Sequence, residues 1–240
     1  NMSYCEDYFN YFYEIIATHT GVTKVFELKK YYDGFLLRYP STKNVEELPE
    51  FKETKKLSWA LHEYETIYKV LNVGTVYRLN KRVKEGSIKE LILLSEALHE
   101  KKIAQIADKI AERKNVKMVL IAGPSSSGKT TFAQRLGLQL RINGIKPVTI
   151  SVDNYFVERE QTPRNEKGEY DFEDINAIDI DLFNDHLLKL LNGEEVEMPE
   201  FDFKVGTKRY NGNKIKMAED EVLVIEGIHC LNDKLTERIP

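Results

Sequence analysis

Residues 123–130 read GPSSSGKT and follow directly on the apolar run VKMVLIA at 116–122. They match the pattern G-x-x-x-x-G-K-[ST] in full, and a helical pattern follows at 131–142. The glycines allow the backbone to turn so that successive N–H groups point into one concavity. Those groups, together with the start of the next helix, attract phosphate oxygens. The sequence therefore predicts a phosphate-binding P-loop between a buried strand and a helix.

The side chains of this loop have separate predicted tasks. Lys129 is expected to bridge the terminal phosphates of a nucleoside triphosphate, and the Thr130 hydroxyl is expected to hold Mg2+. The predicted nucleotide-binding residues are Gly123, Ser125, Ser126, Ser127, Gly128, Lys129, Thr130 and Thr131. ATP and Mg2+ are accordingly the predicted cofactors.

Strands and helices alternate through the C-terminal half of the chain. Continuous apolar runs, typical of strands buried on both faces, lie at 116–122, 147–152 and 222–225. Helical patterns lie between them, at 131–142 and 179–191. The alternation predicts an α/β fold in which a P-loop NTPase parallel sheet carries flanking helices. Because LNDKLTERIP follows so soon after the third run, we expect a sheet truncated at the C-terminus and a chain that is a piece of a longer protein.

The first 95 residues are expected to form a small α+β domain, with a connector helix at 96–115 and the P-loop domain at 116–240. Helical spacing of apolar residues marks three stretches, 8–16, 57–71 and 87–114. Strand patterns mark three others, 23–28, 35–39 and 73–79, and Asp33-Gly34 predicts a hairpin between the first two. Ser87 and Glu90 have the spacing of a capping box at the start of the third helical stretch.

Two acidic residues stand at the ends of predicted strands. Asp153 follows the second strand of the P-loop domain, and Glu226 follows the third. In a parallel sheet the ligand lies beyond these carboxyl ends. Taken alone, each acid would be interpreted as a solvated residue at a strand end or as a helix cap. Beside a P-loop the functional interpretation is favoured, because phosphoryl transfer needs a base and an acid near Mg2+. We therefore predict Asp153 as the base, with Lys129 as its catalytic partner, and Thr130, Glu226 and Asp153 on the metal side.

Four stretches resemble uridine kinase and its relatives in the phosphoribulokinase/uridine kinase group: GPSSSGKTT, SVDNYF, YDFEDINAIDIDLFNDHLLKLLNGEEVEMPEFDF and VLVIEGIH. The resemblance implies a nucleoside-like acceptor whose sugar 5′-hydroxyl gives its proton to Asp153. It also implies that Glu173 meets the ribose hydroxyls and that Phe201 and Phe203 line the nucleobase pocket. Tyr155, in the loop after the predicted base, is a further candidate for contact with the acceptor.

The chain also departs from this group. Gly206 stands where the group usually has a histidine near the pyrimidine, so the resemblance implies a kinase of this group and leaves uridine itself open. The group's arginine-bearing lid falls beyond the third strand, outside this chain. We therefore expect this stretch to be catalytically incomplete by itself.

A fainter resemblance covers the N-terminal part. YDGFLLRYPST and LNVGTVYRLN are similar to the second additional (editing) domain of threonyl-tRNA synthetase. That domain has a cysteine and a histidine where this chain has Gly34 and Arg38. The resemblance implies that the editing chemistry is lost and that the fold serves as a binding or dimerising module.

Composition and charge limit the kinds of binding partner to expect. The net charge of -4 argues against wholesale nucleic-acid binding, and no apolar run approaches the roughly 20 residues of a membrane span. The two cysteines, Cys5 and Cys230, form no CxxC pair, which favours the reducing cytoplasm, and Cys230 is expected to be buried. A small-molecule acceptor is the predicted partner, and a homo-oligomer is compatible with the sequence.

Three functions remain open. The chain is expected to be a nucleoside kinase, but a kinase for a non-nucleoside sugar or polyol would use the same loop and base. An ATPase switch coupled to an N-terminal module that binds RNA or protein is the third. An acid and an aromatic slot at Glu173, Phe201 and Phe203 would favour a nucleoside. A basic cluster around Lys208 and Arg209 would favour a phosphorylated sugar.

Overall fold

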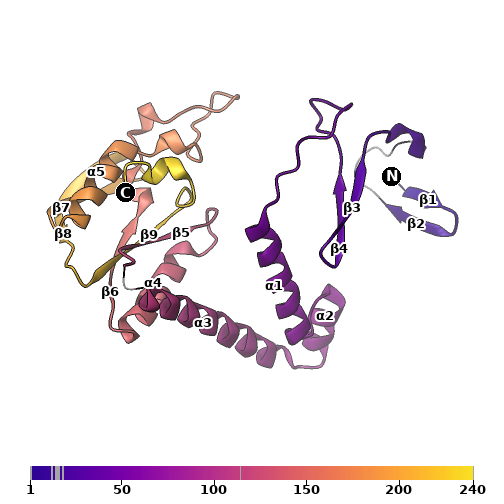
Figure 1. Ribbon diagram of the computed structural model, residues 1–240, viewed down its shortest axis with the longest axis horizontal. Coiled ribbons are helices and arrows are strands. Elements are labelled where there is room, and N and C mark those ends of the chain that lie inside the picture. The colour runs from indigo at the N-terminus through magenta and orange to yellow at the C-terminus, as the bar shows by residue number, and fades with distance from the viewer. Residues whose placement is uncertain (1, 12, 14–16, 18, 114, 240) are drawn as a thin grey trace. The chain divides into compact units, whose positions relative to one another are not determined.

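The computed structural model describes residues 2–11, 13, 17, 19–113 and 115–239 of the 240-residue chain (Figure 1). The chain divides into two compact units, Asn1–Gly74 and Thr75–Pro240. No helix formed by the described residues is both long and apolar enough to cross a bilayer.

The N-terminal unit consists of two hairpins and a helix. Strands β1 (Met2–Cys5) and β2 (Tyr8–Tyr11) pair antiparallel, as do β3 (Glu27–Tyr31) and β4 (Gly34–Arg38). A short 3-10 helix η1 (Thr20–Val22) lies between the hairpins in sequence, and helix α1 (Lys55–Leu71) ends the unit. The predicted hairpin around Asp33-Gly34 and the helix at 57–71 are therefore confirmed.

Two predictions for this region are wrong. The helical spacing at 8–16 belongs to a strand where it is described, because β2 covers Tyr8–Tyr11; residues 12 and 14–16 lie outside the described residues. The strand predicted at 73–79 is instead helix α2 (Val76–Lys84). Thr75 caps this helix, since its Oγ1 accepts a hydrogen bond from the Arg78 N–H at 3.3 Å.

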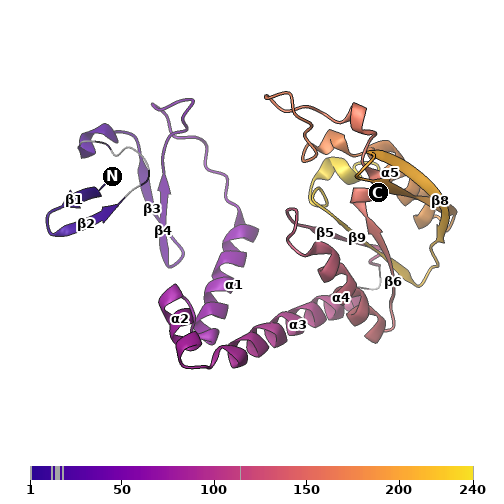
Figure 2. The same cartoon turned by 180° about the vertical axis from the view of Figure 1, so that it is seen from behind.

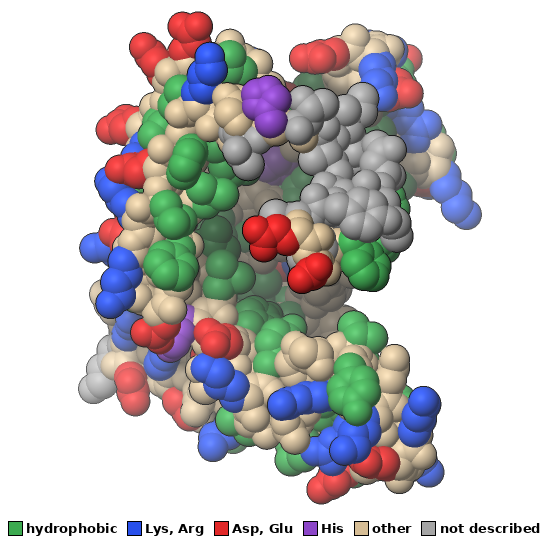
Figure 3. Space-filling model, turned by 90° about the vertical axis from the view of Figure 1, so that its right-hand side faces the viewer, with side chains coloured by type: hydrophobic (Ala, Val, Ile, Leu, Met, Phe, Trp, Pro, Cys, Tyr) green, Lys and Arg blue, Asp and Glu red, His purple; other side chains and the backbone are tan. Residues whose placement is uncertain are grey.

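The N-terminal unit buries little apolar surface. Among the side chains of this unit whose burial the structure describes, which leaves out residues 1–5, 8, 12, 14–16, 18 and 20, Leu71 is the only buried hydrophobic one. Figure 3, a view that includes this unit, shows many hydrophobic side chains at its surface. A two-stranded hairpin is marginally stable without packing against other structure. The unit's own contacts are thus few for its content of large apolar residues.

The C-terminal unit is built on a three-stranded parallel sheet. Its order is β5 (Met118–Ala122), β9 (Glu221–Gly227) and β6 (Lys146–Ser151). The central strand β9 is buried on both faces, as its apolar run VLVI predicts. This sheet with its flanking helices confirms the predicted α/β class.

Each face of the sheet has its own covering layer (Figures 1 and 2). Helices α3 (Ile88–Glu112) and α4 (Lys129–Ile142) pack with Val224 on one face. Helix α5 (Ile180–Leu191) and the hairpin of β7 (Glu195–Asp202) and β8 (Thr207–Lys216) pack with Leu223 and Ile225 on the other. Successive β9 side chains therefore fill two separate cores, as strand geometry requires.

The β7–β8 hairpin was not predicted. Pro199 interrupts β7 and coincides with a shift in pairing register between Glu197 and Pro199, which hides the strand pattern. The connections near the site are short 3-10 turns: η2 (Val152–Tyr155), η3 (Arg159–Gln161), η4 (Ile175–Ala177) and η5 (Asp233–Thr236).

Within the C-terminal unit, helix α3 packs against helix α4, which follows the P-loop. Ile103 and Ala107 are fully buried, and Glu100 accepts hydrogen bonds from Arg135 and Gln139 of α4. The predicted domain limits at residues 95 and 115 stay a prediction. The capping box predicted at the start of α3 does not form, because the Ser87 side chain donates to the Arg82 carbonyl instead.

We expect Ile103→Ala to lower the free energy of unfolding of the C-terminal unit by about 2–5 kcal/mol, since it leaves a cavity between α3 and α4. Ile92→Ala is the matched control on the same helix: this side chain is 50% exposed, and we expect a change within about 0.5 kcal/mol. Urea unfolding followed by circular dichroism measures both. Equal effects would show that α3 does not belong to this core.

Candidate active site

The loop between β5 and α4 has the backbone of an anion cradle. Gly128 has φ +85° and Ser126 has φ +58°, so the chain enters the left-handed region twice in three residues. Such alternation turns successive N–H groups toward one point. A Cβ at Gly123 would lie 2.7 Å from Ser127 Oγ, which shows how tightly the loop closes. Residues 124–128 are exposed, so the cradle is open to a ligand.

The first side chains of α4 have different partners. Thr130 Oγ1 donates a hydrogen bond to Glu226 Oε1 at 3.2 Å, and Glu226, at the end of β9, is only 3% exposed. Lys129 Nζ donates to the Pro124 carbonyl at 3.0 Å across the loop. Thr131 lies in the first turn of α4 and is exposed. The structure thus brings together two of the predicted metal-side groups, Thr130 and Glu226.

These oxygens suit Mg2+, which prefers hard oxygen ligands and commonly takes one or two from protein. Among the described residues no group of three or more His, Cys, Asp or Glu side chains forms a metal cage. The fit is therefore to an ion whose remaining ligands are phosphate oxygens and water.

Asp153 lies in η2, directly after β6, within electrostatic range of the same groups. Burial raises the pKa of its carboxyl, Glu226 raises the pKa further by repulsion, and Lys129 opposes both effects. Parallel pairing accounts for this meeting, because Ser151 of β6 and Ile121 of β5 are both in register with Glu226. Three strand ends therefore deliver the predicted base, the acid and the phosphate loop to one edge of the sheet.

Aromatic rings gather where β7 leads into its turn. Phe201 and Phe203 have ring centroids 5.0 Å apart, and each lies 5.6 Å from the Phe156 centroid. Phe172 joins at 6.0 Å from Phe156. Phe201 is buried, whereas Phe203 is 55% and Phe172 36% exposed. Phe156 and Phe172 were not predicted as site residues, although both follow the predicted base in the same loop.

A hollow of about 450 Å³ adjoins this cluster. Both predicted nucleobase-pocket residues, Phe201 of β7 and Phe203 of the following turn, line it. The full lining is Glu200, Phe201, Asp202, Phe203, Lys204, Arg209 and Asn211. Glu173 is exposed, and its N–H donates to Asp171 Oδ1 at 3.0 Å. It is linked to the aromatic cluster through its neighbour Phe172, and its contact with ribose stays a prediction.

Tyr155 belongs to the core and not to the acceptor site. Its side chain is 0% exposed, its ring lies 5.0 Å from that of Phe183, and its hydroxyl is 3.1 Å from His186 Nδ1. Burial raises the pKa of this hydroxyl well above its usual range. A side chain with no exposed surface does not contact a substrate in this structure, so the prediction for Tyr155 is corrected.

The basic residues near the hairpin are paired with acids. Lys208 Nζ, on a side chain 13% exposed, forms an ion pair with Asp179, and Arg209 Nη2 lies 3.0 Å from Asp202 Oδ2. Backbone N–H groups of residues 204 and 205 and the nearby Arg209 hold the pKa of Asp202 below its usual value. These cations are therefore engaged within the protein.

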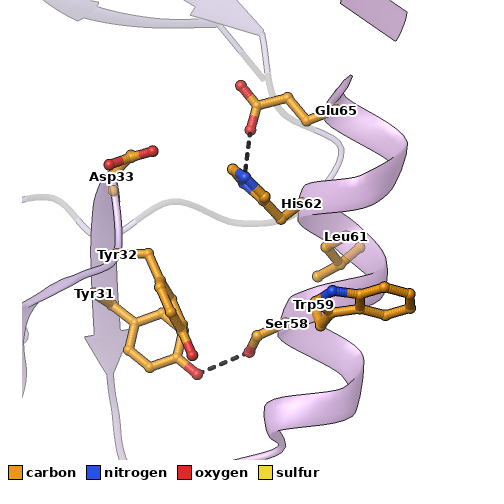
Figure 4. A pocket seen from close by; sticks show the side chains of 9 residues that line it. Tyr31, Tyr32, Asp33, Ser58, Trp59, Leu61, His62 and Glu65 are labelled. Carbon is orange, nitrogen blue, oxygen red and sulfur yellow. Dashed lines mark hydrogen bonds and ion pairs between the residues drawn. The ribbon is translucent and has the colours of Figure 1, made fainter. Parts of the chain in front are cut away.

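A second hollow, of about 660 Å³, lies within the N-terminal unit (Figure 4). Tyr31 and Tyr32, from the turn end of the β3–β4 hairpin, lie opposite Ser58 and His62 of α1. The Tyr31 hydroxyl is 2.8 Å from Ser58 Oγ. This hollow has mixed aromatic and polar walls and shares no lining residue with the site at the sheet edge.

Residues 118–239, just over half of the chain, match the model of the family described as phosphoribulokinase/uridine kinase. A uridine kinase of Halalkalibacterium halodurans is 34% identical over 115 residues, which cover 48% of this chain and 52% of that protein. A uridine kinase of Vibrio vulnificus is 32% identical over 126 residues, covering 52% and 58%. The chain thus spans about half the length of the curated relatives it matches. A solved structure described as a possible uridine kinase from Bacillus stearothermophilus is 24% identical with a TM-score of 0.48, covering 57% of this chain and 75% of that one.

The electrostatics of Asp153 give a measurable sign. We expect its carboxyl to titrate above the roughly 3.9 of an ordinary aspartate. Glu226→Gln removes a repelling negative charge and should lower this pKa, whereas Lys129→Ala removes an attracting positive charge and should raise it. Carbon-detected NMR titration measures this, with the resonance assigned by its loss in Asp153→Asn. An unshifted pKa that neither substitution moves would contradict the described geometry.

Cys230 should be chemically inert in the folded chain. The residue is 2% exposed, and burial raises the pKa of its thiol to about 12. In a Cys5→Ser variant, where it is the sole thiol, we expect reaction with an aromatic disulfide reagent at pH 8 to be at least about a hundredfold slower than in denaturant. Rapid reaction of the folded chain would show that this side of the site is open.

Proposed function

The chain belongs to the phosphoribulokinase/uridine kinase family, and we propose that its C-terminal unit transfers the γ-phosphoryl group of ATP to a sugar hydroxyl of a nucleoside-like acceptor. The observation that carries this proposal is the meeting at one sheet edge of the P-loop, the Thr130–Glu226 hydrogen bond and Asp153. A phosphate cradle with a base beside it is the minimum for phosphoryl transfer to a hydroxyl.

The residues divide the work of the reaction. Loop N–H groups and Lys129 bind the β- and γ-phosphates and stabilise charge on the transferred group. Thr130 and Glu226 would hold Mg2+, which would neutralise phosphate charge. Asp153 accepts the hydroxyl proton as the acceptor oxygen bonds to the γ-phosphorus and the bond from that phosphorus to the bridging oxygen of ADP breaks. Its raised pKa brings this base closer to neutral pH.

Two observations support a nucleoside acceptor over a phosphorylated sugar. The first is the exposed ring of Phe203, which packs on the buried rings of Phe156 and Phe201, because a nucleobase packs well against an exposed aromatic ring. The second is that Lys208 and Arg209 are neutralised by their own acids and so do not form a free phosphate site. A uridine- or cytidine-like nucleoside is the acceptor we propose.

The N-terminal unit has a separate proposed role. Its exposed apolar side chains and its hollow beside α1 support a binding or dimerising module, which is the role that the faint sequence resemblance to the editing domain of threonyl-tRNA synthetase implies. In the alternative function, the chain hydrolyses ATP without a small acceptor, and the N-terminal module controls this hydrolysis as part of an ATPase switch. The acceptor screen below distinguishes this switch from a kinase. We propose that both units act in the cytoplasm.

A phosphoryl-transfer screen of the full-length protein, called the full chain below, against nucleosides, sugars and polyols tests the function. We expect transfer to pyrimidine nucleosides, a loss of about 10²–10⁴-fold in kcat for Asp153→Asn, and a larger loss for Lys129→Ala. Asp185→Asn is the matched control, since this acid forms a surface ion pair with Lys189. It should stay near the unmodified rate.

Three outcomes would overturn parts of the proposal. Normal transfer by Asp153→Asn removes the base. Transfer confined to sugars or polyols removes the nucleoside. ATP hydrolysis that no acceptor changes favours the switch.

A further inference from the structure

Arg159 makes three hydrogen bonds to the turn that joins β7 to β8. Its backbone N–H donates to the Gly206 carbonyl at 2.9 Å. Its guanidinium donates through Nη2 to the Phe203 carbonyl at 2.5 Å and through Nη1 to the Lys204 carbonyl at 3.4 Å. These partners are more than 40 residues away in sequence, so one side chain ties two loops together.

The turn is shaped to receive this arginine. Gly206 has φ +83°, and a Cβ built there would lie 2.6 Å from Arg159 Nε and 2.7 Å from Arg159 Cβ. Any side chain at 206 would therefore displace the arginine as well as strain the backbone. Glu158, the residue before Arg159, also binds the hairpin, because its Oε1 accepts a hydrogen bond from the Lys208 N–H at 3.2 Å.

What the arginine holds is an exposed ring of the proposed acceptor slot. Phe203 is 55% exposed and contacts Phe156, which directly follows η2, the 3-10 turn that carries Asp153. The Phe203 ring packs on Phe156 and Phe201 along one side only, so the backbone of the turn also has to be held for the ring to keep its place. The bond from Arg159 to the carbonyl of Phe203 fixes the backbone that carries this ring relative to the segment that carries the base.

We infer that Arg159 is a positioning residue that holds Phe203 in place for the acceptor. This rests on the proposed kinase function and names a determinant of acceptor binding that the sequence motifs did not reveal. Arg159 has no contact with the P-loop among the hydrogen bonds of the described residues. Its loss should therefore weaken binding of the acceptor and leave ATP binding intact.

Steady-state kinetics of the full chain tests the inference. For Arg159→Ala we expect the KM for the best nucleoside acceptor to rise at least about tenfold, with kcat and the KM for ATP within about threefold, because uniform binding of the acceptor is what is lost. Arg159→Lys should resemble Arg159→Ala, since a lysine keeps the charge but lacks the fork that reaches two carbonyls. Arg238→Ala, which breaks only a surface pair with Asp181, is the matched arginine control.

A double-mutant cycle shows whether the arginine acts through the ring. Phe203→Ala should raise the acceptor KM similarly, and adding Arg159→Ala to it should raise the KM no further. Additive effects would overturn the inference, as would rescue by lysine, which would make Arg159 a charge that contacts the acceptor. A fall in kcat with both KM values unchanged would also overturn it.

Limited proteolysis measures the hold without any acceptor. Lys204 is exposed in the turn, and release of the turn in Arg159→Ala should accelerate tryptic cleavage after Lys204 several-fold over the unmodified chain. An unchanged rate of cleavage after Lys204 would contradict the inference that Arg159 holds the turn. If the unmodified chain phosphorylates no acceptor, the proposed function fails; if it does and Arg159→Ala keeps a normal acceptor KM, only this inference fails.

Discussion

Strand β9 lies between β5 and β6 and runs parallel to both, and this pairing brings together the P-loop, Glu226 and Asp153. The register that sets Glu226 opposite Ile121 and Ser151 puts the P-loop, Glu226 and Asp153 at one edge. The hydrogen bond from Thr130 to Glu226 joins the start of α4 to that edge. A slip of one residue would exchange the β9 side chains between the two cores and would take Glu226 out of line with Ile121 and Ser151.

The parts of the site set by short-range patterns could be predicted from the sequence. The P-loop, Asp153 and Glu226 stand at the ends of continuous apolar runs, and a parallel sheet then requires them to meet. Tyr155 could not be placed in this way, because its burial depends on His186 and Phe183 in a helix further along the chain. Apolar spacing does not reveal which side of a 3-10 turn faces the core.

The elements that were missed have local causes. The β7–β8 hairpin is disguised by Pro199 and its register shift, and α2 is started by a Thr75 cap within a stretch rich in strand-forming residues. Arg159 is a case of tertiary dependence: its partners lie in a turn more than 40 residues away, and only Gly206 leaves room for it. The acceptor slot around Phe203 thus depends on packing between loops, whereas the phosphate-binding loop is formed by the single segment 123–130.

Single-turnover rapid quench with ATP labelled in the γ-phosphate tests the central claim most directly. The full chain, in excess over labelled ATP and saturated with uridine, is predicted to move the label into a uridine phosphate at the rate at which it leaves ATP. If the site transfers the phosphoryl group to a hydroxyl of the acceptor, little of the label should be released as inorganic phosphate by hydrolysis. Label appearing instead as inorganic phosphate, at a rate independent of uridine, would contradict the account.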